Sequence, residues 1–426
     1  MSAVDRGREI AASGQYRAPV AEPWPDGLAP LIDAHAVFTR WLGNDFDTDA
    51  LDAMLAAAAV ERFTDGSDPL WLLLVSGPGN AKTETVQALA GVGAVVTSAI
   101  SSEAALLSAT PKRERAKTAT GGLLRKLGES GVLVVKDVTS ILSMNRDLRA
   151  RVLAALREVY DGSWYREVGT DGGQTIPWQG RIAVVGAVTT AWDTAHQVVS
   201  AMGDRFVLVR LDSSTGRQLA GRRAIGNTGT ETIMRTELAA AVADVIAAMD
   251  TEPITISDAE TDTLLAAADL VTLARTAVEC DYHGNVIDAH APEMPTRFAK
   301  QLAQIVRGAV SVGMNRADAL RLAIRCARDS MPPLRLAIID DLATHPASST
   351  QEVRKRIDKP RSTVDRQLQS LHILGVLTVD EREYEPSGKS RWYYSLADGV
   401  DPAAIKPKPC PEMSVHTPIP SRSESE

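Results

Sequence analysis

The chain has 426 residues, with 46 Lys and Arg against 54 Asp and Glu, which gives a net charge of −8. Hydrophobic residues make up 44% and charged residues 23%, so the chain can bury a sizeable core and global disorder is excluded. No apolar run approaches the roughly 18 residues of a membrane span, the N-terminus lacks a secretory signal, and three scattered cysteines exclude a disulfide framework. We therefore expect a cytoplasmic protein that makes no membrane contact.

The N-terminal half is predicted to form a mixed α/β core over residues 46–215. Residues 1–45 contain prolines at 19, 23, 25 and 30 and are expected to be a loosely structured lead-in, and an Ala-rich helix follows over 47–63. Short runs of Val, Leu and Ile then recur between helical segments at Leu70–Val75, Ala94–Ile100, Val132–Val135, Ile182–Val188 and Phe206–Leu211. Unbroken apolar runs of this length are typical of strands buried on both faces of a parallel sheet.

The C-terminal half changes character twice. Residues 216–331 read as a helical lid without strands. Residues 332–398 show three short helical patterns and then a β-hairpin pattern, which together predict a winged helix-turn-helix. The Pro- and Ser-rich residues 399–426 are expected to be a disordered tail.

The first predicted strand runs directly into a small-residue turn and then a helix. Such a turn can hold phosphate on its backbone N–H groups, with Lys82 reaching the β- and γ-phosphates and Thr83 placing its hydroxyl on Mg²⁺. The pattern departs from G-x-x-x-x-G-K-[ST] at Ser76 and Ala81, which leaves open a plain strand-to-helix turn with a solvated lysine. The residues predicted to bind ATP and Mg²⁺ here are Gly77, Pro78, Gly79, Asn80, Ala81, Lys82 and Thr83.

This loop resembles the G-D-P-G-x-A-K-S loop of minichromosome-maintenance (MCM) helicases. Pro78, Gly79, Ala81, Lys82 and the hydroxyl of Thr83 all match it. The chain thus resembles a divergent AAA+ P-loop ATPase of the MCM-like helicase branch. The resemblance implies an α/β parallel-sheet core with a helical lid, DNA as a partner, and a homo-oligomer that forms a ring, expected to be hexameric.

In that family an acidic pair closes the third strand of the core, one member holding Mg²⁺ and the other polarising the attacking water. Here the pair is Lys136-Asp137. If the register follows the family, Lys136 takes the magnesium position and Asp137 activates water. If it is shifted by one, Asp137 serves the metal and the base is missing. Either alternative predicts slow hydrolysis.

The same resemblance assigns three more residues to catalysis or nucleotide binding. Thr189, at the end of a predicted strand, fits the polar sensor 1 residue, and Arg205 fits the arginine finger that acts on a neighbouring subunit's nucleotide. Arg297, in the predicted lid, fits the sensor 2 arginine. A hairpin predicted around Gly172-Gly173 resembles the pre-sensor hairpin, from which Arg166 or the tip would contact DNA; the alternative is a surface hairpin that buries two tryptophans.

The predicted winged helix-turn-helix carries its own DNA-binding residues. Its second helix has Val364, Leu368 and Leu371 on one face, which leaves a basic and amide-bearing face for the major groove. Two further basic residues lie on the wing, where they would meet backbone phosphate. The predicted DNA contacts are Arg361, Thr363, Arg366, Gln367, Lys389 and Arg391.

In order along the chain, these features favour an ATP-dependent DNA-acting AAA+ ATPase of the helicase or translocase kind. Two alternatives remain from the sequence. One is a nucleotide-sensing winged-helix transcriptional regulator, which a slow ATPase site would suit. The other is an initiator or helicase loader, which would share the finger and the winged helix.

Overall fold

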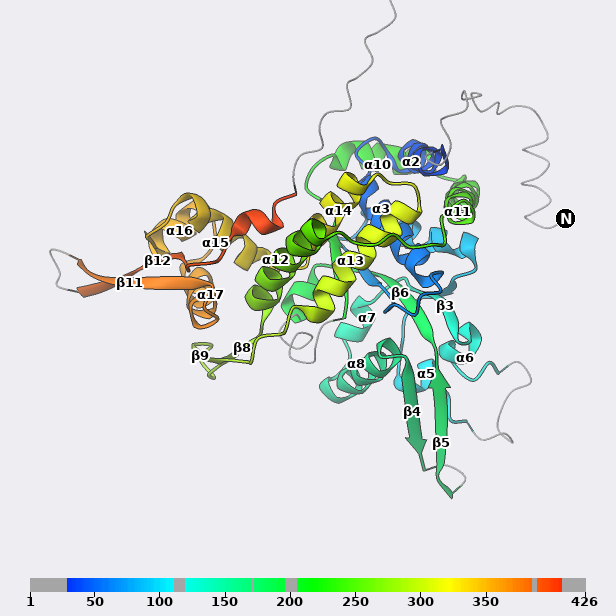
Figure 1. The fold of residues 1–426 in the computed structure, drawn as a ribbon, viewed down its shortest axis with the longest axis horizontal. Coiled ribbons are helices and arrows are strands. Elements are labelled where there is room, and N and C mark those ends of the chain that lie inside the picture. Colours follow the sequence, from blue (N-terminus) through cyan, green and yellow to red (C-terminus); the bar gives the residue numbers. More distant parts are fainter. Residues whose placement is uncertain (1–28, 111–118, 170–171, 196–204, 385–388, 408–426) are drawn as a thin grey trace, which may run out of the picture.

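In the computed structural model, which describes residues 29–110, 119–169, 172–195, 205–384 and 389–407, a parallel five-stranded sheet forms the centre of the molecule (Figure 1). Its order is β2 (Val95–Thr97), β3 (Ser130–Val135), β6 (Arg181–Val188), β1 (Trp71–Val75) and β7 (Val207–Arg210). Each strand lies within two residues of its predicted position except β2, which is shorter. The predicted α/β parallel-sheet core is confirmed.

Both faces of the sheet are covered, because alternate strand residues point to opposite sides. Leu72 and Leu74 belong to one buried cluster, together with α3 (Thr48–Glu61), α11 (Glu231–Ala247) and α13 (Thr296–Ser311). Leu73 and Val75 belong to the other, together with α8 (Arg146–Tyr160). The core further contains α4 (Lys82–Gln87), the 3₁₀ helix η1 (Ala88–Val92), α5 (Glu103–Leu106), α6 (Leu123–Leu127), α7 (Thr139–Leu142) and the hairpin strands β4 (Ser163–Val168) and β5 (Gln174–Gln179).

Helix α3 lies between the sheet and α13 and is buried along almost its whole length. Its run of alanines allows close approach, since a small side chain leaves the backbone accessible to a neighbour. At the crossing, a Cβ added to Gly308 of α13 would lie 2.4 Å from the carbonyl oxygen of Ala56. No residue larger than glycine fits at position 308.

The expectation of a loose lead-in over residues 1–45 is wrong for its last part. Helix α2 (Ala29–Leu42) buries Leu31, Ala34 and Phe38 and packs against α11. Pro30 lies in the first turn of this helix, where the missing N–H has no partner to lose, so the proline does not break it. Residues 1–28 lie outside the described part of the chain.

The expectation that strands end after residue 216 is also wrong. Between α12 (Asp258–Arg275) and α13, the strands β8 (Val278–Cys280) and β9 (Val286–Ala289) form an antiparallel hairpin. The other helices of this region are α10 (Arg217–Gly226) and α14 (Arg316–Asp329). Nothing in the local sequence marks these strands, because they are short and mostly exposed.

The C-terminal unit has the helices and hairpin predicted for residues 332–398. Helices α15 (Pro333–Thr344), α16 (Thr350–Arg356) and α17 (Arg361–Ile373) pack with a three-stranded antiparallel sheet of β10 (Ser348–Ser349), β12 (Lys389–Leu396) and β11 (Leu377–Tyr384). The predicted disordered tail begins too early, because the 3₁₀ helix η4 (Pro402–Ile405) packs against α12 and buries Ile405. Residues 408–426 lie outside the described part. Over the described residues, no helix combines the length and apolarity that a bilayer span requires.

A group of ion pairs ties α14 to the start of α3. Arg321 and Arg325 each donate to the Asp49 carboxylate at 2.8 Å. Although burial acts in the opposite direction, the hydrogen bonds from these two arginines lower the pKa of Asp49 from 3.8 to about 2.

This shift predicts a loss of stability in acid. The pKa of Asp49 is lower in the folded chain than in the unfolded chain, so its contribution is present above pH 3.8 and is lost as the pH falls toward 2. We expect about 2 kcal/mol of unfolding free energy to disappear over this range. When urea unfolding is measured at several pH values, the free energy of unfolding of Asp49→Asn should fall less steeply between about pH 4 and pH 2 than that of the natural chain. The exposed Asp33→Asn serves as a control and should keep the wild-type slope; equal slopes for both variants would contradict the assignment.

Candidate nucleotide site and DNA-facing helix

The turn between β1 and α4 has the backbone geometry of an anion-binding loop. Gly79 and Ala81 have positive φ angles of 80° and 51°, with Asn80 between them. Alternating backbone handedness of this kind points successive N–H groups into one concave nest. Ala81 stands where the consensus loop has glycine, yet it adopts the left-handed conformation, at a cost of about 1 kcal/mol. The departure from the consensus therefore leaves the loop shape intact.

Lys82 is buried at the base of this loop. Its Nζ donates to the Ser76 carbonyl oxygen at 3.0 Å, to Ser76 Oγ at 2.8 Å and to the Gly77 carbonyl oxygen at 2.6 Å. Burial lowers the pKa of Lys82 below its usual value. The alternative of a solvated surface lysine does not match this position. Thr83 follows in the first turn of α4 and is exposed, so its hydroxyl can reach a ligand.

Asp137 and Thr189 lie at the same edge of the sheet as the loop. Asp137 directly follows β3, Thr189 follows β6, and β6 lies between β3 and β1. The N–H of Ser76 donates to the carbonyl oxygen of Val188 at 3.3 Å, which joins the loop to the residue before Thr189. The structure thus places Lys82, Asp137 and Thr189 along the same carboxyl edge of the sheet.

The side chains at this edge are held by short local bonds. Asp137 is exposed, and its Oδ1 accepts a hydrogen bond from the N–H of Thr139 at 2.9 Å. Thr139 Oγ1 also accepts from the N–H of Thr189 at 3.2 Å, and the two hydroxyl oxygens lie 3.3 Å apart. Lys136, half-buried, donates its backbone N–H to Thr97. One carboxylate, rather than two, therefore lies at the end of β3.

These residues fit the phosphates of a nucleotide. The nest and the Lys82 ammonium are groups that recognise phosphate, and the exposed Thr83 carries the hydroxyl that would bind its Mg²⁺. Among the described residues, no three His, Cys, Asp or Glu side chains cluster as a protein-built metal site would require. A magnesium ion at this edge would accordingly depend on Thr83, Asp137 and the oxygens of the nucleotide itself.

Two contacts that hold the phosphate loop and α4 in place were not predicted from the sequence. Asn80 Nδ2 donates to the carbonyl oxygen of Asp212 at 2.8 Å, which fixes the loop to the turn after β7. Arg235 of α11 makes a two-pronged bond to Glu84 of α4, with distances of 2.7 and 2.8 Å. Both join segments far apart in the sequence, and neither Asn80 nor Glu84 carries a local signal for its partner.

Arg205 lies at the opposite edge of the sheet. It precedes β7, and its Nη2 donates to Asp161 Oδ2 at 3.3 Å just after α8. Its carbonyl oxygen accepts from the buried Gln301 of α13 at 2.6 Å, and its guanidinium lies 5.8 Å from the centre of the Tyr160 ring. The side chain is 11% exposed. Burial lowers the pKa of Arg205, and the nearby positive charge of Arg297 lowers it further.

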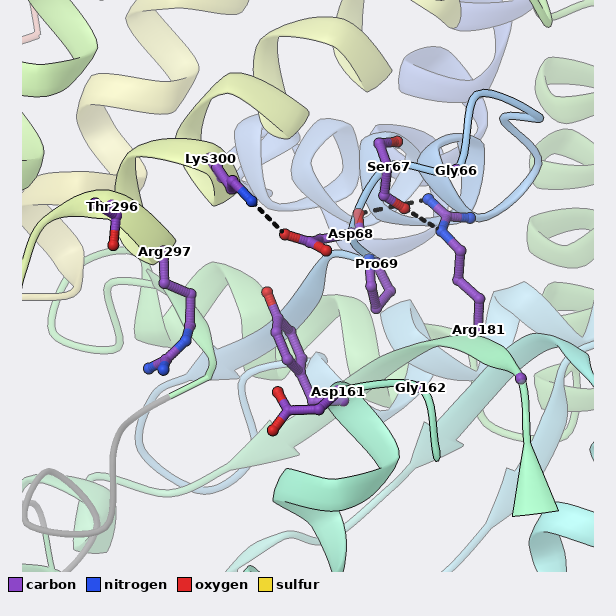
Figure 2. A pocket seen from close by; sticks show the side chains of 12 residues that line it. Gly66, Ser67, Asp68, Pro69, Asp161, Gly162, Arg181, Thr296, Arg297 and Lys300 are labelled. Atoms are coloured by element: carbon purple, nitrogen blue, oxygen red, sulfur yellow. Dashed lines mark hydrogen bonds and ion pairs between the residues drawn. The ribbon is translucent and has the colours of Figure 1, made fainter. Parts of the chain in front are cut away.

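Arg297 lines a cavity of about 420 Å³ at this amino edge. Figure 2 shows Arg297 and Lys300 on one side of the cavity and Asp161 on another, with Lys300 paired to Asp68 at 3.2 Å. The length of β1, roughly 16 Å at about 3.3 Å per residue, separates this cavity from the phosphate loop. The structure therefore groups Arg297 with Arg205 and not with the Lys82 of the same chain.

The hairpin β4–β5 projects from the core beside α8 (Figure 1). Trp164 and Trp178 are buried at its base. Arg166, one of the two suggested DNA contacts, instead bonds to Glu103 and to the carbonyl oxygen of Leu107. The tip at 170–171 lies outside the described residues. The base of the hairpin matches the alternative of a packed surface element.

Helix α17 presents its first turn to solvent. Val364, Leu368 and Leu371 are buried against the rest of the unit, as predicted, and Arg361 and Thr363 are exposed. The other predicted DNA contacts on α17, Arg366 and Gln367, have partners within the chain: Arg366 donates to the carbonyl oxygen of His283, and Gln367 accepts from Arg335. Arg391 is exposed on β12, whereas the Lys389 side chain lies outside the described part.

No protein-family model and no curated protein matches the chain. Among solved structures, the chain is similar to a full-length MCM homolog from Methanopyrus kandleri, with 14% identity, a TM-score of 0.39, and coverage of 74% of this chain and 64% of that chain. It thus spans less than two thirds of that homolog. It is also similar to the C-terminal region of NrS-1, with 10% identity, a TM-score of 0.28, and coverage of 90% of this chain and 79% of that chain. A third similar structure is the Aeropyrum pernix ORC1 protein in complex with DNA, with 13% identity, a TM-score of 0.21, and coverage of 90% of this chain and 92% of that chain. The chain has an α/β fold with a parallel five-stranded sheet.

Proposed function

We propose that the chain is a DNA-acting ATPase of the AAA+ type whose ATP site is completed by a second copy of the same chain. The observation that supports this most directly is the division of the predicted site between two edges of the sheet. Lys82, Asp137 and Thr189 lie at the carboxyl edge, and Arg205 and Arg297 lie at the amino edge.

The division has a simple geometric consequence. A side chain of arginine spans far less than the roughly 16 Å of β1, so neither arginine reaches a nucleotide on its own loop. Copies that stack carboxyl edge against amino edge place both arginines at the neighbour's phosphates. Such a heterologous contact repeats from copy to copy and closes as a ring when the rotation allows. The resemblance to MCM helicases suggests six copies.

In this arrangement each residue has a distinct task. The loop N–H groups and Lys82 would bind the phosphates, and Thr83 and Asp137 would hold a Mg²⁺ ion, which supplies positive charge against them when bound. Thr189 orients the attacking water, and the neighbour's Arg205 stabilises the charge that develops on the γ-phosphate. The C-terminal unit, as a winged helix, supplies DNA contacts from the exposed first turn of α17.

Steady-state ATP hydrolysis, measured with and without single- and double-stranded DNA, tests the proposal. DNA-stimulated turnover is the expected result and would make strand-displacement assays worthwhile. A rate of ATP hydrolysis that is the same with and without DNA would contradict the proposed action on DNA and would leave an ATPase with another substrate.

Lys136 favours a second candidate, a nucleotide-controlled DNA-binding switch that hydrolyses ATP slowly. If Lys136 occupies the magnesium position, its positive charge opposes the metal, and Lys136→Asp should raise turnover roughly tenfold, a change of about 1.4 kcal/mol in the barrier. The exposed Lys126→Asp controls for the change in net charge. Unchanged turnover in Lys136→Asp would instead place Asp137 in the metal position and leave the base missing.

A further inference from the structure

The β8–β9 hairpin of the lid lies against the predicted recognition helix (Figure 1). Arg366 of α17 donates from Nη2 to the carbonyl oxygen of His283 at 2.8 Å. Its guanidinium also lies directly on Gly284, where an added Cβ would come within 2.9 Å of it. Gly284 has a φ of +80°, so both the backbone and the close approach call for glycine.

The tip of this hairpin is fixed before it meets α17. The Asp281 carboxylate accepts hydrogen bonds from the N–H groups of His283 and Asn285 at 2.9 and 2.8 Å. The side-chain amide of Asn285 donates to the same carboxylate at 2.8 Å. The carbonyl oxygen that holds Arg366 therefore belongs to an ordered turn.

A second contact links the neighbouring residue of α17, through Arg335 of α15, to the segment where the hairpin begins. Gln367 Oε1 accepts from Nε of Arg335 at 2.9 Å. Arg335 is 5% exposed and donates to the carbonyl oxygens of Ala274 and Thr276 at 2.7 Å, at the end of α12 where the hairpin begins. Of the residues predicted to contact DNA, Arg366 is therefore bound by the hairpin itself, and Gln367 is held by an arginine of its own unit that is anchored where the hairpin begins.

The hairpin carries negative charge, which repels the phosphate backbone of DNA. Glu279 and Asp288 lie opposite each other across the two strands and are exposed, and residues 278–290 contain no lysine or arginine. Like charges in opposed positions weaken a hairpin, so their presence here is not explained by its stability. A phosphate backbone brought to this face of α17 would meet carboxylates.

We propose that the β8–β9 hairpin is an intrachain brake, which occupies the Arg366 face of α17 and competes with DNA for it. The brake rests on the proposed DNA binding of α17. Because the hairpin connects α12 to α13, which carries Arg297, its release would link the state of the subunit interface to DNA engagement.

The test compares full-length variants that have the same charge. Gly284→Val strains the turn and intrudes on the Arg366 guanidinium, whereas Gly229→Val imposes similar strain (φ +89°) where no atom lies within 4 Å. Fluorescence anisotropy with a labelled random-sequence duplex should give a Kd about fivefold lower for Gly284→Val, and an unchanged Kd for Gly229→Val. Thermal melting checks that both variants fold.

Amide hydrogen exchange of the natural chain gives the second measurement. With duplex added, the amides of α17 should exchange more slowly and those of residues 281–286 faster. Equal Kd values for all three chains would overturn the brake while DNA binding stands. Slower exchange in the hairpin would also overturn it, because the hairpin would then be part of the DNA contact. No binding by any chain would remove the proposed DNA function and the brake with it.

Discussion

Lys82→Ala is expected to lower kcat/KM for ATP hydrolysis by at least about a hundredfold. The Lys82 ammonium is a buried charge within bonding distance of the loop carbonyls, and a phosphate that enters the nest would take over those bonds. Loss of one such group from a site that stabilises developing charge costs two to three orders of magnitude in typical enzymes, roughly 2.7–4 kcal/mol. Steady-state release of inorganic phosphate measures the effect.

The exposed Lys126→Ala is the matched control and should hydrolyse ATP at the natural rate. Lys82 would contribute both to ATP binding and to the rate of hydrolysis. Calorimetric titration with Mg-ATP measures the binding affinity alone and so separates the two effects. Turnover within a factor of two of the natural chain in Lys82→Ala would show that hydrolysis takes place elsewhere.

Arg205→Ala is expected to lower turnover by about a thousandfold, the lower end of what an arginine finger contributes. The defect should be repaired in part by mixing. In a ring of Arg205→Ala and Lys82→Ala copies, some interfaces join an intact phosphate loop to an intact Arg205. Turnover measured across mixing ratios should therefore exceed that of either variant alone.

Two outcomes would count against this assignment. If no ratio restores activity, Arg205 does not act on a neighbour's nucleotide. If Arg205→Ala hydrolyses ATP at the natural rate, the proposal that two copies of the chain complete one ATP site is wrong. Because Arg205 is paired with Asp161, Arg205→Lys is the folding control: it keeps the charge but loses the planar fork, and should melt at the natural temperature while remaining slow.

The sequence was informative where the physical signal is local. Buried strands are apolar throughout, so the runs at Leu70–Val75 and Ile182–Val188 predicted β1 and β6 almost to the residue. Lys82, Asp137 and Thr189 were assigned to one site through the resemblance to MCM helicases, and each follows a strand of the parallel sheet at its carboxyl edge.

The remaining features depend on contacts between distant segments. Helix α2 follows a proline-rich stretch and is held by Arg40 and Trp41, which bond to Glu237. The β8–β9 hairpin is too short to show a period and packs against α17, far along the chain. Arg366 was assigned to DNA from its place on a helix, but its partner is a carbonyl oxygen of residue 283, which no pattern near 366 reveals.

The crossing of α3 and α13 determines how the molecule can move. At Gly308 the two backbones touch without side chains between them, so one helix cannot slide or roll over the other without a steric clash. Helix α13 also carries Arg297 and holds Arg205 through Gln301, so both arginines are fixed to the sheet as one block. In the proposed assembly, a change at one nucleotide would therefore tilt a whole protomer against its neighbour. The ring would then move as a set of rigid protomers, with the flexible points at the interfaces between the chains.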